Sequence, residues 1–243
     1  MKQESMFQEF YKSAHGNTNT PKALGNAVIH QDASTFMGTL PTGQVDLIFT
    51  DPPYGINYYS GHYIGDNPFD EIENDEVEFD IFPLLNQSAR VLVDSGALYL
   101  CCRWDNYLQW APKIDGTGLT LRNVIIWVKN NWTAGDLEGN FGYQYEMILF
   151  ITKGRHKLRG YRYSNVWTFD RVPPDRLVHP TQKPTKLIMR AIKASTDKWE
   201  WVVDPYCGSG SSGLACQETD RVFTLCDTSE KYVKLSKERL GIR

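Results

Sequence analysis

The stretch Val45-Asp46-Leu47-Ile48-Phe49-Thr50-Asp51-Pro52-Pro53-Tyr54 determines the organisation expected for the rest of the chain. Its first six residues are mostly apolar and β-prone, which predicts a strand over residues 45–50. Proline cannot donate a hydrogen bond to a sheet ladder, so this strand must end before the two prolines. The loop that follows is therefore expected at the carboxyl edge of the sheet, which is where open α/β sheets bind their ligands.

The residues Asp51, Pro52, Pro53 and Tyr54 offer the groups needed to bind an amine on an aromatic ring. The Asp51 carboxylate and a backbone carbonyl held stiff by the prolines can accept hydrogen bonds from an exocyclic amino group. The phenol ring of Tyr54 can stack on the ring that carries this amine. An ordinary turn after a strand uses the same residue types, so these four residues alone leave both interpretations open.

The length and composition are those of one large α/β domain with a sizeable core. No apolar run approaches the roughly 18 residues that span a bilayer, and the first residues lack the apolar centre of a secretion signal. The five cysteines include no Cys-x-x-Cys pair, which argues against a disulfide framework and against a zinc site. We therefore expect a cytoplasmic protein with reduced thiols, no metal and no membrane partner.

Segments with strand and helix patterns alternate along the chain. Strands are expected at residues 27–30, 45–50, 97–102, 123–129, 143–153, 201–204 and 221–227. Helices are expected at residues 33–40, 80–93, 105–115, 185–194, 211–219 and 229–240. This alternation predicts a mostly parallel, seven-stranded sheet that is covered on both faces and contains one antiparallel hairpin. Residues 1–24 are expected to form an arm, and residues 25–243 one domain.

The net charge of −3 conceals an uneven distribution of charged residues. Residues 66–80 contain eight carboxylates and no Lys or Arg, and they overlap a long loop at residues 55–78 that we expect to be mobile. Residues 153–176 contain seven Lys or Arg interleaved with aromatic residues, a composition typical of nucleic-acid contact surfaces. A solvated hairpin of ordinary charge is the alternative. The candidate DNA contacts in this segment are Arg155, Lys157, Arg159, Tyr161, Arg162, Tyr163 and Trp167.

A second loop, Asp204-Pro205-Tyr206-Cys207-Gly208-Ser209-Gly210-Ser211-Ser212-Gly213, lies between a predicted strand and a predicted helix. Its glycines have the G-x-G-x-x-G spacing of a nucleotide-binding turn, and Asp227 ends the next strand, where an acid can bind ribose hydroxyls or cap a helix. The Asp-Pro pair before the glycines is unlike the dehydrogenase pattern. Only 30 residues follow Gly213, too few to complete a nucleotide-binding sheet. Strands from the N-terminal half must complete it, so the motif order is circularly permuted.

Together these motifs resemble those of the beta class of amino methyltransferases, DNA enzymes of bacteria and phages that use S-adenosylmethionine. Residues 51–54 resemble the catalytic motif of the family, and residues 204–212 resemble its cofactor loop. His179-Pro180-Thr181-Gln182-Lys183-Pro184 matches the segment that closes over the methionine end of the cofactor. The resemblance covers about residues 25 to 240 and implies a single Rossmann-like methyltransferase domain, with the catalytic loop first and the glycine loop last.

The resemblance also implies a set of cofactor contacts. Asp32 stands where the family places an acid near the adenine of the cofactor, and Asp227 stands where it places the ribose acid. Lys183 supplies a cation that can pair with a carboxylate. Three residues of the glycine loop depart mildly from the family motif, namely Tyr206, Ser211 and Ser212. The candidate cofactor-binding residues are Asp32, Asp51, Thr181, Gln182, Lys183, Asp204, Pro205, Tyr206, Gly208, Gly210, Ser211 and Asp227. His179 is expected to be structural. Segments 127–129 and 146–150 resemble later strands of the family and carry no assigned role.

The reaction that the resemblance implies is direct methyl transfer to N6 of a flipped adenine in DNA. Asp51 and the carbonyl of Pro52 would hydrogen-bond the two amino protons, with the sulfonium methyl held in line about 3 Å from the nitrogen. Asp at position 51 resembles the adenine-modifying branch, whereas the N4-cytosine branch more often has Ser there. N4-cytosine methylation is the alternative, followed by methylation of RNA. No Pro-Cys nucleophile precedes a helix, which disfavours carbon methylation.

Residues 154–178 occupy the interval in which relatives carry target recognition. This interval has only 25 residues, which favours limited sequence specificity or a reader shared with the 55–78 loop or a second subunit. Because relatives are often dimers, the resemblance also allows a homodimer.

Overall fold

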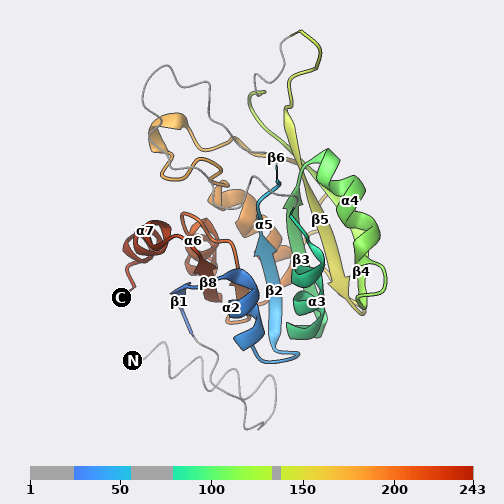
Figure 1. The fold of residues 1–243 in the computed structure, drawn as a ribbon, viewed down its shortest axis with the longest axis vertical. Helices are drawn as coiled ribbons and strands as arrows, with labels where there is room; N and C mark the ends of the chain where they lie inside the picture. The colour runs from blue at the N-terminus through green and yellow to red at the C-terminus, as the bar shows by residue number, and fades with distance from the viewer. Residues whose placement is uncertain (1–24, 56–78, 133–137, 243) are drawn as a thin grey trace.

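The computed structural model describes residues 25–55, 79–132 and 138–242 (Figure 1). The expected arm at residues 1–24 and nearly all of the loop expected at residues 55–78 lie outside the described residues. Within the described ranges, no helix combines the length and apolar character needed to cross a bilayer.

One α/β sheet with the strand order β1-β8-β7-β2-β3-β5-β4-β6 organises the described part of the chain. The strands are β1 (Ala27–His30), β2 (Val45–Thr50), β3 (Leu92–Cys102), β4 (Leu119–Val128), β5 (Tyr145–Lys153), β6 (Val166–Thr168), β7 (Trp201–Asp204) and β8 (Val222–Asp227). The helices are α2 (Ala33–Thr39), α3 (Phe82–Val91), α4 (Trp104–Ile114), α5 (Thr185–Ser195), α6 (Ser211–Gln217) and α7 (Glu230–Leu240), with a 3-10 turn, η1, at Pro174–Arg176. β5 is antiparallel to both of its neighbours, and the other pairings are parallel.

All of the expected strands and helices are confirmed, with ends that move by a few residues. The expected strand count is wrong, because the sheet has eight strands in the described ranges rather than seven. The additional strand is β6, which pairs in parallel with the last residues of β4. It has three residues inside a polar, basic stretch, too few to show an alternating pattern.

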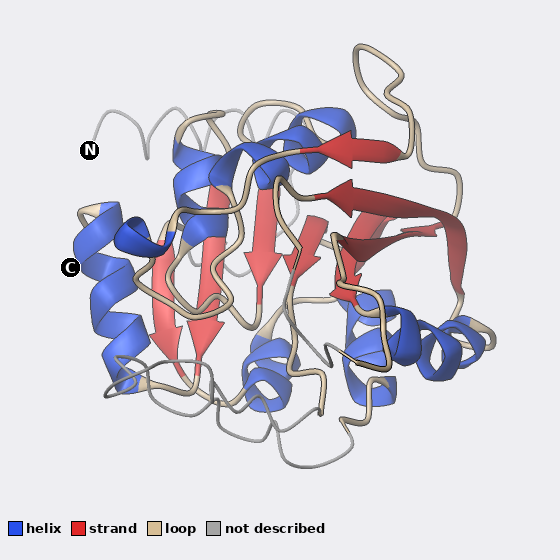
Figure 2. Cartoon of the chain, turned by 90° about the horizontal axis from the view of Figure 1, so that it is seen from above, coloured by secondary structure: helices blue, strands red, loops and turns tan. Residues whose placement is uncertain are grey.

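Helices lie on both sides of the sheet (Figure 2), and one hydrophobic core lies on each face. In β2, Ile48 belongs to the core that includes residues of α2, α3 and α4. Leu47 and Phe49 belong to the other core, with residues of α5, α6 and α7. Because successive side chains of a strand point to opposite faces, a strand buried on both faces must be apolar at nearly every position. This explains the nearly continuous apolar run before the catalytic loop.

The permuted order expected from the sequence is confirmed by the strand neighbours. β2 lies beside β7, with Leu47 opposite Val202 and Ile48 opposite Val203. β1 pairs with β8, so strands from the N-terminal part of the chain complete the sheet around the glycine loop. Since β2 and β7 are adjacent and parallel, the loops that follow them leave the sheet at the same, carboxyl edge.

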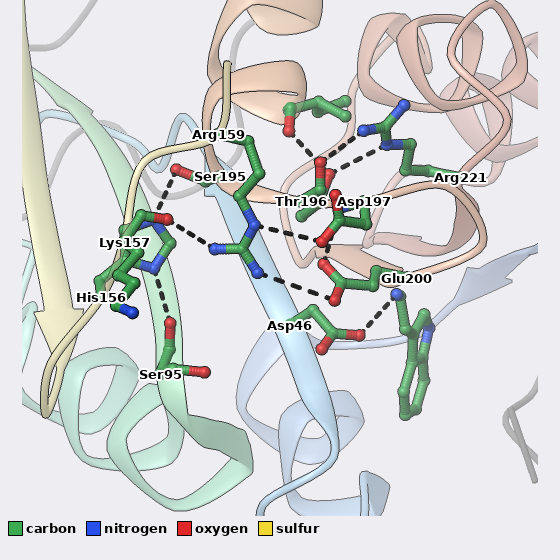
Figure 3. Close-up of polar contacts among 12 residues, drawn as sticks. Asp46, Ser95, His156, Lys157, Arg159, Ser195, Thr196, Asp197, Glu200 and Arg221 are labelled. Atoms are coloured by element: carbon green, nitrogen blue, oxygen red, sulfur yellow. Dashed lines mark hydrogen bonds and ion pairs between the residues drawn. The ribbon is translucent and has the colours of Figure 1, made fainter. Parts of the chain in front are cut away.

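Asp46 is a buried carboxylate near the opposite, amino edge of the sheet (Figure 3). It accepts a hydrogen bond of 2.8 Å from the backbone N–H of Trp201. Burial, reinforced by Glu200, raises the pKa of Asp46 from 3.8 to about 7. The folded state therefore binds this proton more tightly than the unfolded state, so the free energy of unfolding falls as the pH rises from about 4 to about 7.

We expect Asp46→Asn to raise the melting temperature at pH 8 by about 2–8 °C, because Asn keeps an oxygen acceptor for Trp201 without a buried charge. The gain should shrink as the pH is lowered towards 4, where the wild-type carboxyl is already protonated. Calorimetry at several pH values checks this result. A lower melting temperature for the variant at pH 8 would contradict it.

Candidate active site

Asp51 follows β2 directly and lies in a buried cluster of charged side chains. The Nζ atom of Lys183 is 2.5 Å from Asp51 Oδ2, and the Tyr54 hydroxyl donates a hydrogen bond to Asp51 Oδ1. Burial raises the pKa of the Asp51 carboxyl, and Lys183 and Tyr54 oppose that rise. Burial disfavours the charge of Lys183, but Asp51 and Glu146 outweigh this effect and raise the pKa of the ammonium above its usual range. Asp51 and Lys183 therefore form an ion pair.

The cluster continues onto the antiparallel hairpin of β4 and β5. Lys183 Nζ is 3.1 Å from Glu146 Oε2, and the other carboxylate oxygen, Oε1, is 2.5 Å from Lys129 Nζ. Burial raises the pKa of Glu146, but the two lysines dominate and lower it to about 2. Two cations and two anions thus alternate in the order Lys129, Glu146, Lys183, Asp51. The sequence patterns assigned no role to Lys129 or Glu146. The available signal was a charge beside an apolar run, since residues 124–128 precede Lys129 and residues 147–150 follow Glu146.

The glycine loop starts at Asp204, the last residue of β7, and is closed by hydrogen bonds of its own. The buried Asp204 carboxylate accepts a bond of 2.6 Å from the Ser212 hydroxyl and one of 3.1 Å from the Tyr206 N–H. Burial raises the pKa of Asp204 to about 7. In β8, Asp227 accepts a bond of 2.8 Å from the Gly208 N–H, which ties the loop to the next strand. Asp204 and Asp227 thus shape the loop that was expected to hold the cofactor.

Gly210 has a backbone conformation and a neighbour that together exclude a side chain. Its φ is +75°, and an added Cβ would lie 2.9 Å from Ser236 Oγ in α7. We expect Gly210→Ala to destabilise the protein by about 2–3 kcal/mol and to weaken cofactor binding. Gly43 is the matched control, because its φ is +66° but an added Cβ would meet nothing within 4 Å. Gly43→Ala should cost only about 1 kcal/mol and leave cofactor binding unchanged.

Thermal unfolding and calorimetric titration of both glycine variants with S-adenosylmethionine measure these effects. Equal losses of stability in the two variants would show that the close approach of Gly210 to α7 adds nothing to the cost of the Gly210 substitution.

The segment that carries Lys183 also contacts the glycine loop. His179 lies against Gly208, where an added Cβ would be 3.1 Å from His179 Nε2, and its ring lies 4.3 Å from that of Tyr232. Burial, with the nearby Lys183 charge, lowers the pKa of His179 to about 4, so its imidazole is neutral at pH 7. Its Nδ1 atom accepts a 3.3 Å hydrogen bond from the Thr181 N–H. These contacts fit the structural role expected for His179.

Aromatic side chains connect the two loops at the carboxyl edge. The ring of Tyr54 contacts Trp110 at 6.2 Å, Trp110 contacts Phe79 at 6.0 Å, and Phe79 contacts Tyr206 at 5.8 Å. Asp32 also lies at this edge, because it follows β1, whose last residue, His30, pairs with Asp227 at the end of β8. In α4, Asn106 donates a 3.0 Å bond to the Tyr54 carbonyl, a contact that no sequence pattern indicated.

The remaining candidate residues lie in the same loops. Pro52, Pro205 and Ser211 are buried, Pro53 is partly exposed, and Gln182 accepts a 3.1 Å bond from the Val178 N–H. Within the described ranges, no group of three or more His, Cys, Asp or Glu side chains has an arrangement that could hold a metal ion. The residues brought together are therefore those of the catalytic loop, the glycine loop and the 179–184 segment.

The first part of the basic segment does not join this edge (Figure 3). His156 Nδ1 lies 2.6 Å from the carbonyl of Ser95, and Arg159 Nε lies 3.3 Å from Asp197, which precedes β7. Because β5 is antiparallel to β3, it delivers the chain to the amino edge, about 17 Å along the strands from the catalytic loop. Arg155, Lys157 and Arg159, which were expected to contact DNA, thus lie towards the amino edge and away from the catalytic loop.

Trp167 was expected to contact DNA, but its position rules this out. Only 4% of its surface is exposed, its indole N–H donates a 2.8 Å bond to the Ser164 carbonyl, and its ring packs on Tyr99. It is a core residue of β6. Tyr161 and Tyr163 are exposed and contact each other at 5.1 Å, and they stay candidates together with the exposed Arg162.

Comparison with known proteins agrees with this geometry. Residues 45–238 match the model of a family described as DNA methylase, which covers N6 and N4 enzymes. The chain is 27% identical over 237 residues to the type II methyltransferase M2.DpnII of Streptococcus pneumoniae, covering 88% of each protein. It is 28% identical over 263 residues to the DNA adenine methyltransferase YhdJ of Escherichia coli, covering 91% of this chain and 86% of that protein.

The fold is also that of solved methyltransferases. The crystal structure of the M1.HpyAVI–SAM complex superposes with a TM-score of 0.65 and 23% identity, covering 88% of this chain and 99% of that one. The resemblance to amino methyltransferases that the motifs indicated is thus confirmed over most of the sequence. The chain belongs to the DNA methylase family.

Proposed function

We propose that this protein transfers the methyl group of S-adenosylmethionine to N6 of adenine in DNA. The observation that carries the proposal is the Asp51–Lys183 ion pair, because it joins the catalytic loop to the segment that packs on the glycine loop through His179 and Gly208. The relative YhdJ is named a DNA adenine methyltransferase. N4-cytosine methylation is the second candidate, because the matched family covers both N6 and N4 enzymes.

The residues present fit S-adenosylmethionine. Asp227 ends β8, and Asp32 follows the adjacent β1; these carboxylates are suited to ribose hydroxyls and to an adenine amine. The left-handed Gly208 and Gly210 allow a close backbone approach. Lys183 is a cation within reach of the same edge and suits a carboxylate. When bound, the cofactor supplies an electrophilic methyl group on a sulfonium.

The chain's own contribution is to orient the amine. The lone pair of adenine N6 is delocalised into its ring, so the nitrogen is a weak nucleophile. The Asp51 carboxylate and the Pro52 carbonyl accept hydrogen bonds from its two N–H groups and favour a tetrahedral nitrogen. Each oxygen of Asp51 already accepts one hydrogen bond, from Tyr54 or Lys183, and keeps a second lone pair for this task. The Tyr54 ring stacks on the flipped base.

The target contacts and the assembly are part of the same proposal. Tyr161, Arg162 and Tyr163 are the side chains of the basic segment that we propose to contact DNA, and residues 154–178 act as a short recognition segment. We also propose that residues 25–243 form one methyltransferase domain, that the protein acts in the cytoplasm, and that it forms a homodimer, which sedimentation would test.

Incubation with S-adenosylmethionine carrying a tritiated methyl group tests the proposal. Unmodified DNA, RNA and protein are offered in parallel, with the Asp51→Asn variant as the control. We expect label in DNA only, and only with the wild-type protein. Label in RNA or in protein without label in DNA would overturn the proposed function.

A further inference from the structure

The charged cluster contains a carboxylate, Glu146, that the reaction described above does not use. Glu146 is the second residue of β5 and is followed by the apolar run Met147-Ile148-Leu149-Phe150. In the β4–β5 ladder it stands opposite Trp127. Lys129, the residue that follows β4, is two residues beyond Trp127 and is therefore the diagonal neighbour of Glu146 on the same face of the sheet. A charge in such a strand is sustained only when it is paired, and Glu146 is paired on both of its oxygens.

We propose that Glu146 is a positioning residue for methyl transfer: it holds the Lys183 ammonium against Asp51 and is itself held by Lys129. The proposal rests on the proposed function, since Asp51 is taken as the group that binds the target amine. The β4–β5 hairpin, through Glu146, thereby helps to determine the geometry of the loop that follows β2 and carries Asp51.

The geometry of Lys183 gives the reason for a second carboxylate. A lysine side chain has a flexible four-carbon stem and three rotatable donors, so one partner does not determine where its ammonium lies. Lys183 precedes α5 on a short segment. Its ammonium donates a hydrogen bond of 2.5 Å to Asp51 and forms an ion pair with Glu146 at 3.1 Å. With one carboxylate from the loop after β2 and the other from β5, the ammonium has one position, and this position orients Asp51.

Lys129 completes the arrangement. It lies 2.5 Å from the Glu146 oxygen that faces away from Lys183, so Glu146 cannot turn to give both oxygens to Lys183. The four side chains sum to zero charge and come from the catalytic loop, the end of β4, β5 and the 179–184 segment. If stability were the only need, apolar residues of similar volume would serve as well, because the desolvation of buried ions offsets their attraction. The series instead ends on the carboxylate that binds the substrate.

Three substitutions test the proposal in single-turnover methyl transfer to DNA. Glu146→Gln places an amide NH₂ group against an ammonium. We expect a single-turnover rate about 10- to 100-fold lower, with half-saturating concentrations of DNA and cofactor within about threefold of wild type. Glu146→Asp restores a carboxylate, and the flexible side chains of both lysines can reach it although it is one carbon shorter. Its rate should recover to within about fivefold of wild type. Glu238→Gln, the same chemical change on the exposed face of α7, should leave the rate unchanged.

A double-variant cycle tests whether Glu146 acts through Lys183. Glu146→Gln combined with Lys183→Met should be no slower than Lys183→Met alone, within about twofold to threefold. The proposal would be overturned if the rate losses of the two single variants multiplied in the double variant. A Glu146→Gln rate within twofold of wild type would overturn it as well.

Hydrogen exchange provides a readout that needs no activity. The amides of residues 181–183 should exchange about tenfold faster or more in Glu146→Gln than in wild type, and at the wild-type rate in Glu238→Gln. Unchanged exchange in Glu146→Gln would overturn the proposal. A wild-type protein that transfers no methyl group to DNA would instead refute the proposed function, and the exchange experiment would still decide whether Glu146 positions the segment.

Discussion

Replacing Asp51 by Asn is expected to lower the rate of methyl transfer to DNA by about 10³-fold while cofactor affinity changes by less than about tenfold. Asn keeps the shape of the side chain but presents an NH₂ group where the amine of the base needs an acceptor. The buried Lys183 ammonium keeps Glu146 as a partner at 3.1 Å, so the substitution does not leave an isolated charge. Rapid-quench kinetics and calorimetric titration with S-adenosylmethionine measure the two quantities.

The matched control is Asp46→Asn, the same substitution near the other end of β2. It should transfer methyl groups at the wild-type rate, because Asp46 lies at the amino edge and accepts its hydrogen bond from the start of β7. If Asp51→Asn kept a rate within tenfold of wild type, Asp51 would lose its catalytic role. If the Asp51→Asn variant lost cofactor binding as well, the result would show that Asp51 maintains the structure of the site.

Replacing Lys183 by Met is expected to lower the free energy of unfolding by about 3–5 kcal/mol, or the melting temperature by about 6–20 °C. The substitution leaves two buried carboxylates, Asp51 and Glu146, with Lys129 as the remaining cation of the cluster. Protonation relieves that excess charge, so the deficit should shrink as the pH is lowered from 9 to 5.

The Lys183 and Glu146 contributions in the wild-type protein should change little over the same pH range. The pKa of Lys183 is raised, so its contribution is present through neutral pH and is lost only as the pH rises through that raised value. The pKa of Glu146 is lowered to about 2, so its contribution is present above about 4.5 and is lost as the pH falls through about 2. Thermal unfolding at pH 5, 7 and 9 makes the comparison, with Lys186→Met, an exposed position on α5, as the control. A loss of the same size at all three pH values would contradict the expected coupling.

The sequence predicts most of the fold because local patterns and chain order determine it. Alternating strands and helices require a parallel sheet, and the carboxyl ends of adjacent parallel strands must share an edge. The convergence of Asp51 with the loop after Asp204 follows from these two facts. The missing strand, β6, has three residues and is formed by pairing with β4, which no local pattern records.

The parts that could not be predicted depend on strand direction and register. Seventeen positions separate Lys129 from Glu146 in the sequence, and they meet only because the β4–β5 ladder sets Trp127 opposite Glu146. The basic residues before position 160 suggested a DNA surface by composition. Composition does not predict at which edge of the sheet the segment after a strand lies. Because β5 is antiparallel to β3, it ends at the amino edge. Trp167 was misjudged for a related reason, since its burial follows from its place in β6.

Mass spectrometry of the nucleosides from unmethylated DNA, after incubation with the protein and S-adenosylmethionine, tests the proposed chemistry most directly. The predicted result is N6-methyladenine that appears with the wild-type protein and is lost with Asp51→Asn. DNA that gains N4-methylcytosine and no N6-methyladenine, or that gains neither base, would contradict it.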